Sequence, residues 1–290
     1  MDMTGKHLAI TGPTAGIGKA SALELACRGA QLTLLCRNRA KGEQLRDEVI
    51  AAGGLAPHVI LMDMSELDSV REAAAQCLAL GQPLDVLLNN AGVVNLKRKE
   101  TVDGFEETLA VNHFAPFLLT GLLLPQLLQA PAPRIVNVAS AAHEFVRSMG
   151  FNDMQAERKY SVFTVYGRSK LANILFTRTL SQRLADKPIT VNCLHPGAVA
   201  TSLGRQNPGF MGKILPLFLK PFFLSPEQGA ATSLYLCCSD EVAQVSGEYF
   251  ARSALKQARP WARDDAAAEE LWAYTEKALD FTFFGPAGSR

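Results

Sequence analysis

Six short apolar segments alternate with longer helical segments over the first 200 residues, and this alternation restricts the fold more than any other feature of the sequence. The apolar segments are rich in Val, Ile and Leu and rarely alternate with polar residues, as in strands buried on both faces of a parallel sheet. Parallel strands are joined by helical crossovers. The sequence therefore predicts a single doubly wound α/β domain of Rossmann type, with a mostly parallel seven-stranded sheet and helices on both faces. The expected strands are residues 7–11, 31–36, 58–62, 84–88, 134–139 and 189–194, with a seventh at 248–251.

Helical patterns fill the intervals between these segments, and no linker, repeat or low-complexity tract divides the chain. We therefore expect one domain over residues 1–290, with a helical extension from about 264 to 290. Two irregular segments, 141–159 and 201–225, follow expected strands, and open parallel sheets bind ligands beyond the carboxyl ends of their strands. These segments are the expected walls of a substrate pocket. The expected helices are residues 16–28, 40–52, 66–79, 103–128, 160–185 and 226–238.

Composition and spacing argue against several classes of protein. A net charge of +1 gives no reason to expect nucleic acid or an anionic membrane as a partner. The apolar runs near 117–128 and 214–224 are shorter than the ~20 residues of a membrane-spanning helix. Six cysteines without CxxC spacing, and histidines scattered over separate elements, predict no metal site. Reduced thiols, together with no secretory signal pattern, predict a cytoplasmic protein.

A glycine-rich turn follows the first expected strand and precedes a helix. Glycines let such a turn bend tightly and let the backbone approach a pyrophosphate at the helix N-terminus. A P-loop is the rival interpretation, but five residues instead of four separate Gly12 from Gly18, and Ala20 replaces the hydroxyl residue that would hold Mg²⁺. A turn with a purely structural role stays open. The predicted dinucleotide contacts are Gly12, Thr14, Gly16, Ile17 and Gly18.

The end of the second expected strand predicts which dinucleotide binds. NAD enzymes usually place an acidic residue here for the ribose 2′-hydroxyl, whereas this strand ends in Cys36 and Arg37. The Arg37 guanidinium can pair with a 2′-phosphate that a carboxylate would repel, so we expect NADP(H). A solvated charge at a strand end is the alternative.

The ends of the next two strands supply further predicted cofactor contacts. Asp63, followed by Met64, can accept a hydrogen bond from an adenine amino group. Asn90, Ala91 and Gly92 follow the fourth strand, and Gly92 leaves room for a ribose against the backbone.

Tyr166 and Lys170 lie four residues apart on one expected helix face, downstream of Ser140 at the end of the fifth strand. A nearby ammonium should lower the pKa of the phenol and let Tyr166 act as general acid and base. Ser140 can hold the substrate oxygen against Tyr166, and Asn112 can carry a water towards Lys170. Taken singly, each has a structural alternative, because Tyr-x3-Lys pairs and strand-end serines are common.

In this order and on these elements, the residues resemble the short-chain dehydrogenase/reductase family over residues 5 to about 250. The resemblance implies that Tyr166 is the general acid/base, that Lys170 also binds the nicotinamide ribose, and that Ser140 orients the substrate. It also implies that Asn112 supports a proton relay. The nicotinamide end is expected to contact Pro196, Gly197, Val199 and Thr201.

Residues 35–43 and 166–173 are most similar to the retinol dehydrogenase-like branch, which implies a lipophilic alcohol or aldehyde. Thr14 departs from the Asn that is usual there. The resemblance implies a homodimer or homotetramer formed through the helix at 117–124 and the Tyr166 helix. The segment from about 201 to 225, which is apolar over 204–224, is interpreted as a substrate lid, with core packing or shallow membrane contact as alternatives.

The sequence thus predicts an NADP(H)-dependent oxidoreductase, such as a carbonyl reductase, that interconverts an alcohol and an aldehyde or ketone of retinoid-like, steroid-like or other apolar character. A non-catalytic NADP-binding regulator or scaffold on the same fold is the alternative. A serine hydrolase is excluded because there is no Gly-x-Ser-x-Gly elbow.

Overall fold

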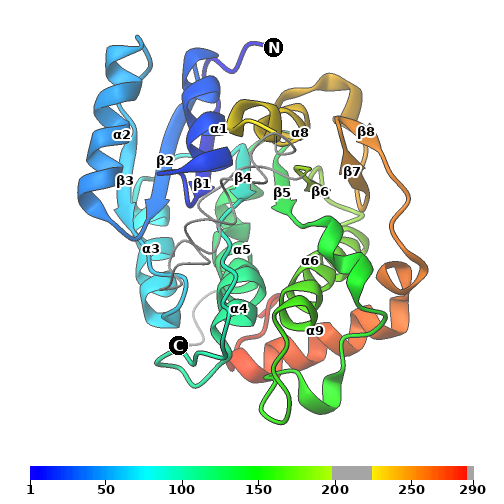
Figure 1. Ribbon diagram of the computed structural model, residues 1–290. Helices are drawn as coiled ribbons and strands as arrows, with labels where there is room; N and C mark the ends of the chain where they lie inside the picture. Colours follow the sequence, from blue (N-terminus) through cyan, green and yellow to red (C-terminus); the bar gives the residue numbers. More distant parts are fainter. Residues whose placement is uncertain (198–223, 286–290) are drawn as a thin grey trace.

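One sheet with strand order β3-β2-β1-β4-β5-β6-β7-β8 organises the computed structural model, which describes residues 1–197 and 224–285 (Figure 1). Strands β1 to β7 pair in parallel, which confirms the predicted doubly wound α/β fold. The bounds are β1 His7–Thr11, β2 Gln31–Cys36, β3 His58–Leu61, β4 Val86–Asn89, β5 Arg134–Val138, β6 Thr190–His195, β7 Tyr249–Ala251 and β8 Ala254–Leu255.

The short strand β8 was not predicted. It pairs antiparallel with β7 through a two-residue turn, Arg252 and Ser253, whose φ angles are +52° and +56°. Turns of this left-handed kind usually carry Asn or Gly, so this turn has no sequence signal. The sheet therefore has one more strand than the seven expected.

Helices cover both faces of the sheet, and each face has its own apolar core. Helices α1, α2 and α8 pack on one face; α3, α5, α6 and α9 pack on the other (Figure 1). We call the core under α1, α2 and α8 the first core and the core under α3, α5, α6 and α9 the second core. Neighbouring residues of β4 point to opposite cores: Leu88 lies in the first core and Leu87 in the second, as expected for a strand buried on both sides. The bounds are α1 Gly16–Cys27, α2 Arg39–Ala51, α3 Leu67–Ala79, α5 Ala115–Leu127, α6 Val162–Arg183, α8 Pro226–Cys238 and α9 Asp265–Leu279.

The helix expected over residues 103–128 is divided in the structure. It starts later, as α4 Glu107–Leu109, because the buried Glu106 carboxylate accepts from the backbone N–H groups of Thr108 and Leu109 and so caps the helix. A π-helical turn, Ala110–Phe114, then leads into α5. Such turns are frequent at functional sites, and this one carries Asn112.

Helix α5 is almost wholly enclosed. By length and composition alone the continuous helical stretch Glu107–Leu127 could cross a membrane, because it includes the residues before the apolar run at 117–128. The core helix of a compact domain passes the same test, and 89% of its most apolar window is buried inside the structure. Its apolar character is accounted for by packing against the sheet and against α3, α6 and α9.

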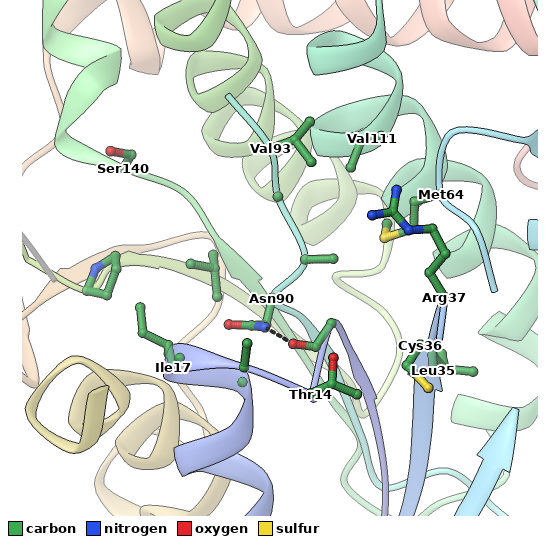
Figure 2. Close-up of a pocket in the computed structure, with 18 of the residues that line it drawn as sticks. Thr14, Ile17, Leu35, Cys36, Arg37, Met64, Asn90, Val93, Val111 and Ser140 are labelled. Carbon is green, nitrogen blue, oxygen red and sulfur yellow. Dashed lines mark hydrogen bonds between the residues drawn. The ribbon is translucent and has the colours of Figure 1, made fainter. Parts of the chain in front are cut away.

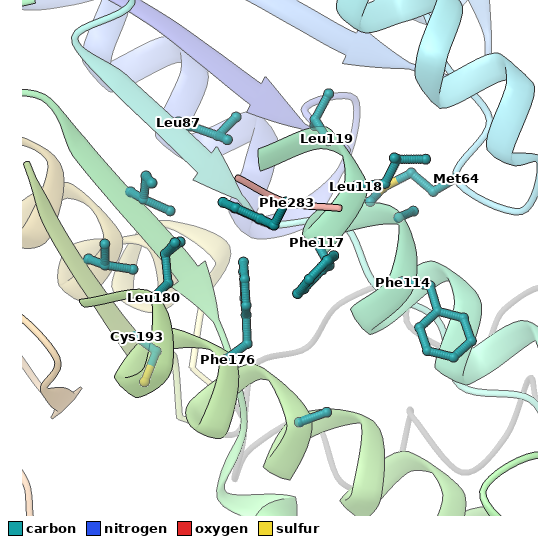
Figure 3. Close-up of a cluster of buried hydrophobic side chains, with 14 of the residues drawn as sticks. Met64, Leu87, Phe114, Phe117, Leu118, Leu119, Phe176, Leu180, Cys193 and Phe283 are labelled. Carbon is teal, nitrogen blue, oxygen red and sulfur yellow. The ribbon is translucent and has the colours of Figure 1, made fainter. Parts of the chain in front are cut away.

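Helix α9 lies within the extension expected at 264–290 and closes the second core. Trp272 packs edge-on against Phe117 of α5, at 4.9 Å between ring centroids, and against the Arg183 guanidinium of α6 at 4.3 Å. Phe283, beyond the helix, lies 5.0 Å from Phe117 (Figure 3). Gly121 of α5 has no room for a Cβ, which would lie 2.6 Å from the Phe281 ring.

Candidate active site

A cleft of about 480 Å³ lies beyond the carboxyl ends of β1, β4 and β5. The strand order reverses between β1 and β4, and such switch points are where open α/β sheets bind ligands. Arg37 and Cys36 stand at one end of the cleft and Ser140 at the other (Figure 2). The predicted site residues that line it are Gly12, Thr14, Gly16, Ile17, Gly18, Arg37, Asp63, Met64, Asn90, Ala91, Gly92, Ser140, Tyr166, Lys170, Pro196 and Gly197.

The glycine-rich turn is shaped for close backbone approach. Gly12 and Gly16 have φ angles of +63° and +53°, in the left-handed region. A Cβ on Gly18 would lie 2.3 Å from the Gly12 carbonyl oxygen, so the turn closes only without a side chain. No side chain caps the start of α1, so its first backbone N–H groups can bind an anion. The wall is thus suited to a pyrophosphate.

Asn90 lines the cleft and also holds this turn, and its contact with a cofactor stays a prediction. Its amide Nδ2 donates to the carbonyl oxygens of Thr11 (2.9 Å) and Gly12 (3.2 Å; Figure 2). In return, the Thr11 hydroxyl accepts from the backbone N–H groups of Asn90 and Ala91. Sequence reasoning missed Thr11, which is fully buried and joins the end of β1 to the segment after β4.

Arg37 is held loosely at the far end of the cleft. Its side chain is 68% exposed, and its Nε lies 3.9 Å from the Asp63 carboxylate. That carboxylate is fixed by Ser65, which donates to it from both its backbone N–H and its hydroxyl. The weak, exposed ion pair leaves the guanidinium able to bind another anion. Arg39 pairs with Glu43 on α2 instead.

Lys170 is buried, and its ammonium donates a hydrogen bond to the Val138 carbonyl oxygen at 2.9 Å. Its Nζ lies 5.8 Å from the centre of the Tyr166 ring, which confirms that the two side chains share one face of α6. Burial lowers the pKa of Lys170 to about 8. An ammonium has three donors, so this group can still bind hydroxyls in the cleft.

The expected lowering of the Tyr166 pKa is not found in the chain alone. Burial raises the pKa of Tyr166, and the Ser140 hydroxyl opposes this in part. The prediction left out desolvation, which is the largest cause of the change in the pKa of Tyr166. A further positive charge in the cleft would therefore be needed to favour the phenolate, and an oxidised nicotinamide ring would supply one.

Asn112 lies behind the cleft and does not line it. It is fully buried; its amide donates to the Val93 carbonyl and the Ser169 hydroxyl, both at 3.0 Å, and its Oδ1 accepts from the Val93 N–H at 2.7 Å. A Cβ on Gly92 would lie 3.2 Å from Asn112 and 3.4 Å from Lys170 Nζ. Asn112 thus joins the segment after β4 to α6; its part in a proton relay stays a prediction.

Some lining residues had no sequence signal, and two predicted ones cannot be placed. Val199 and Thr201 lie outside the described residues, as does the expected lid at 201–225 except for its last two positions. Val111 reaches the cleft because the π-helical turn changes the direction of successive side chains, which an ordinary helical pattern does not anticipate. The other lining residues missed from the sequence are Ala15, Leu35, Cys36, Met62, Val93, Glu107, Val138 and Ala139.

Comparison with known proteins agrees with this geometry. The family model described as short chain dehydrogenase matches residues 6–209. Retinol dehydrogenase 14 of Mus musculus is 42% identical, over 94% of this chain and 86% of that protein. An uncharacterised protein of Mycobacterium paratuberculosis has a similar structure, with 30% identity, a TM-score of 0.78 and coverage of 97% and 96%. An NAD(P)-dependent gluconate 5-dehydrogenase of Beutenbergia cavernae, solved with NADP bound, has 26% identity, a TM-score of 0.68 and coverage of 87% and 96%.

The buried ammonium of Lys170 predicts a measurable cost in stability. In the unfolded chain the lysine pKa is about 10.4, so between pH 8 and 10 the unfolded state binds more protons and the native state gains stability as pH rises. Lys170→Met should therefore be more stable than wild type at pH 7, by about 1–3 kcal/mol. The difference in the free energy of unfolding between Lys170→Met and the wild type should narrow as pH rises above 8, as measured by urea unfolding of the cofactor-free protein. The exposed Lys41→Met is the matched control and should show neither effect. A Lys170→Met variant that is less stable at pH 7 would contradict the interpretation.

Proposed function

This chain belongs to the short-chain dehydrogenase family, and on that premise we propose that it is an NADP(H)-dependent oxidoreductase that interconverts an alcohol and an aldehyde or ketone. One observation carries the proposal: Ser140, Tyr166 and Lys170 line the same cleft as the glycine-rich turn and Arg37. A proton-transfer group and a dinucleotide-binding wall in one cleft are what hydride transfer to a carbonyl requires.

In this proposal each side chain has a separate task. Tyr166 gives a proton to the carbonyl oxygen during reduction and takes it back during oxidation. The Ser140 hydroxyl, which also accepts from the Ala142 N–H at 3.1 Å, holds the same oxygen. Lys170 keeps a cation beside the phenol and offers its remaining donors to a ribose. When bound, the nicotinamide cofactor supplies or accepts the hydride.

The choice of NADP(H) over NAD(H) rests on Arg37. Arg37 follows β2 directly and lines the end of the cleft where the adenosine ribose of a dinucleotide would lie. Its ion pair with Asp63 is weak, so the guanidinium is available to bind a 2′-phosphate. The Beutenbergia cavernae relative, which was solved with NADP, supports the same choice.

We propose an apolar substrate, retinoid-like or steroid-like. The similarity to a retinol dehydrogenase supports this class. Phe145 and Phe163 support it too: they are 68% and 72% exposed, lie 6.2 Å apart edge to face, and stand five residues after Ser140 and three before Tyr166. Exposed aromatic side chains beside a reactive group suit an apolar ligand. A non-catalytic NADP-binding scaffold is the alternative, and the complete Ser-Tyr-Lys set disfavours it.

We also propose a cytoplasmic location, in keeping with free cysteines at all six positions, and self-association as in the expected homodimer or homotetramer. The interface is proposed to differ from the one implied by the resemblance. Helix α9 lies against α5 and α6, where it pairs Asp265 with Arg178 and Glu269 with Arg183. A partner subunit would have to displace it, so another surface is the better candidate.

Tyr166→Phe tests the reaction itself. The variant keeps the ring and loses the proton donor, so turnover should fall by at least about 100-fold while NADPH still binds. Activity is followed by NADPH absorbance over a panel of aldehydes, ketones and alcohols, and binding by NADPH fluorescence. Tyr160→Phe, whose hydroxyl bonds to the Asn95 carbonyl, is the control and should stay active. Tyr166→Phe with wild-type turnover would refute the mechanism, and NADPH binding by the wild type without turnover on any compound would favour the scaffold.

Arg37→Asp tests the cofactor preference. Its carboxylate should repel a 2′-phosphate and weaken NADPH binding by about 10- to 100-fold, while NADH binding changes little. Arg39→Asp is the matched control because Arg39 is similarly exposed and pairs with Glu43. Equal losses for the two nucleotides, or equal effects of the two substitutions, would show that Arg37 does not select the phosphate.

Arg183→Glu tests the proposed interface by sedimentation velocity. The substitution breaks the contacts of Arg183 with Glu269 and the Trp272 ring, so it should lower stability and leave the association constant unchanged. Arg46→Glu, on the exposed side of α2, is the control. An association constant that changes only with Arg183→Glu would restore α5 and α6 as the interface.

A further inference from the structure

Two histidines outside the Ser-Tyr-Lys group each hold the backbone of one wall of the cleft. His143 lies in the short 3-10 helix Ala141–Phe145, and its Nδ1 is 2.8 Å from the Ser140 carbonyl oxygen. His195 ends β6, and its Nδ1 accepts from the Gly197 N–H at 3.1 Å. Ser140 and Gly197 both line the cleft.

Both rings rest on the same third ring. Tyr249 of β7 meets His143 edge to face, at 5.2 Å between centroids and 77° between planes. It stacks on His195, at 5.9 Å and 27°. The three residues come from segments up to 106 positions apart, and β6 and β7 are paired so that Cys193 lies opposite Tyr249. The Tyr249 ring therefore fixes the distance between the two histidines.

The hydrogen bonds require opposite tautomers. A carbonyl oxygen only accepts, so Nδ1 of His143 carries the proton. The Gly197 N–H only donates, so Nδ1 of His195 carries the lone pair and its proton sits on Nε2. Burial lowers the pKa of both histidines, which keeps the rings neutral and the tautomers defined near pH 7.

The Tyr249 hydroxyl does not contribute to this arrangement. Tyr249 is 3% exposed and its hydroxyl is buried without a hydrogen-bond partner among the described residues; the same holds for Nε2 of His143. The backbone of His143 is held by Trp261, whose Nε1 donates a hydrogen bond to the His143 carbonyl oxygen at 3.1 Å. Its neighbour Glu144 is paired with Lys256 and Arg259, and the Lys256 ammonium also lies over the Tyr249 ring, 6.0 Å from its centroid.

We propose that His143, Tyr249 and His195 form a positioning unit that sets the separation between the wall carrying Ser140 and the wall formed by Pro196 and Gly197. The unit rests on the proposed function, in which the first wall holds the substrate oxygen and the second contacts the nicotinamide. Hydride transfer depends steeply on that separation, since a displacement of about 1 Å can reduce turnover about 100-fold. None of the three residues lines the cleft, so each acts through the backbone that it holds.

The His143 part is tested with a pair of amide substitutions. In His143→Asn the amide nitrogen can occupy the place of Nδ1 and still donate to Ser140, whereas in His143→Gln it reaches the place of Nε2. We expect kcat to stay within about threefold of wild type for His143→Asn and to fall by about 10- to 100-fold for His143→Gln, with the NADPH Kd unchanged in both. Equal kcat values for the two variants would overturn this part.

The His195 part is read out by cofactor binding. His195→Asn keeps an oxygen that can accept from Gly197, and His195→Leu keeps the volume without an acceptor. The NADPH Kd, measured by fluorescence, should rise about tenfold for His195→Leu, because the Gly197 N–H loses its acceptor, and stay near wild type for His195→Asn. Equal Kd values would overturn this part.

Tyr249 supplies the control for both. Tyr249→Phe removes a hydroxyl that has no partner among the described residues and keeps the ring, so kcat and the NADPH Kd should be unchanged. Tyr249→Leu removes the shared ring, so it should lower kcat and raise the NADPH Kd. Thermal unfolding of every variant separates a loss of folding from a loss of position, and a Tyr249→Phe variant as impaired as Tyr249→Leu would refute the shared-ring unit. If the wild type binds NADPH but turns over no substrate, the proposed function fails, while the His195 and Tyr249 binding measurements still decide on the unit.

Discussion

The contact between the ends of β1 and β4 is the constraint on which the site depends. The chain after β1 crosses to β2 on one side, and the chain after β4 crosses to β5 on the other. Beyond their carboxyl ends, β1 and β4 are therefore not joined by further ladder hydrogen bonds. The side chains of Asn90 and Thr11 replace them with bonds to each other's backbone. This holds the Gly12 turn against the start of α1, where Gly18 leaves no space for a Cβ. The phosphate-binding wall, the entry to the cleft and the direction of α1 all follow from that one junction.

The side of the cleft that holds Tyr166 and Lys170 carries a cost in stability that the surrounding core offsets. The Lys170 side chain is buried and donates a hydrogen bond to the Val138 carbonyl, and burial lowers the pKa of Lys170 to about 8. Beneath it, Asn137 accepts from Asn89 at 2.9 Å and donates to Thr177 at 2.9 Å, so β4, β5 and α6 are joined by buried polar side chains. Hydrogen bonds between buried side chains of three elements fix the relative positions of those elements, although Asn89 Oδ1 has no hydrogen-bond partner among the described residues. Tyr166 and Lys170 are thus held by a rigid part of the fold, although the burial of the Lys170 ammonium is itself unfavourable.

Much of the fold and of the site could be predicted from the sequence, because those parts depend on local signals. The bounds of β1 and β2 match the expected segments because glycine-rich turns and buried aliphatic runs mark them. The rest depends on contacts between distant segments. The π-helical turn around Asn112 has no pattern of its own, and the sign of the Tyr166 pKa change follows from burial that only the fold creates. For the same reason His143 and His195 looked like scattered histidines, since only the ring of Tyr249 brings them together.

The C-terminal helix connects the core to this site through two consecutive residues of the π-helical turn. Asn112 faces Val93 and Ser169 at the back of the cleft, whereas His113 faces α9. The Thr275 hydroxyl donates to the Leu271 carbonyl at 2.8 Å, so towards His113, 3.0 Å away, it must accept. The proton of His113 is therefore on Nε2, and burial, which lowers its pKa to about 3, keeps the ring neutral. Because Asn112 and His113 are neighbours in one turn, a displacement of α9 that moves His113 should also move Asn112. Helix α9 is thus part of the support of the catalytic cleft as well as a cover for α5 and α6.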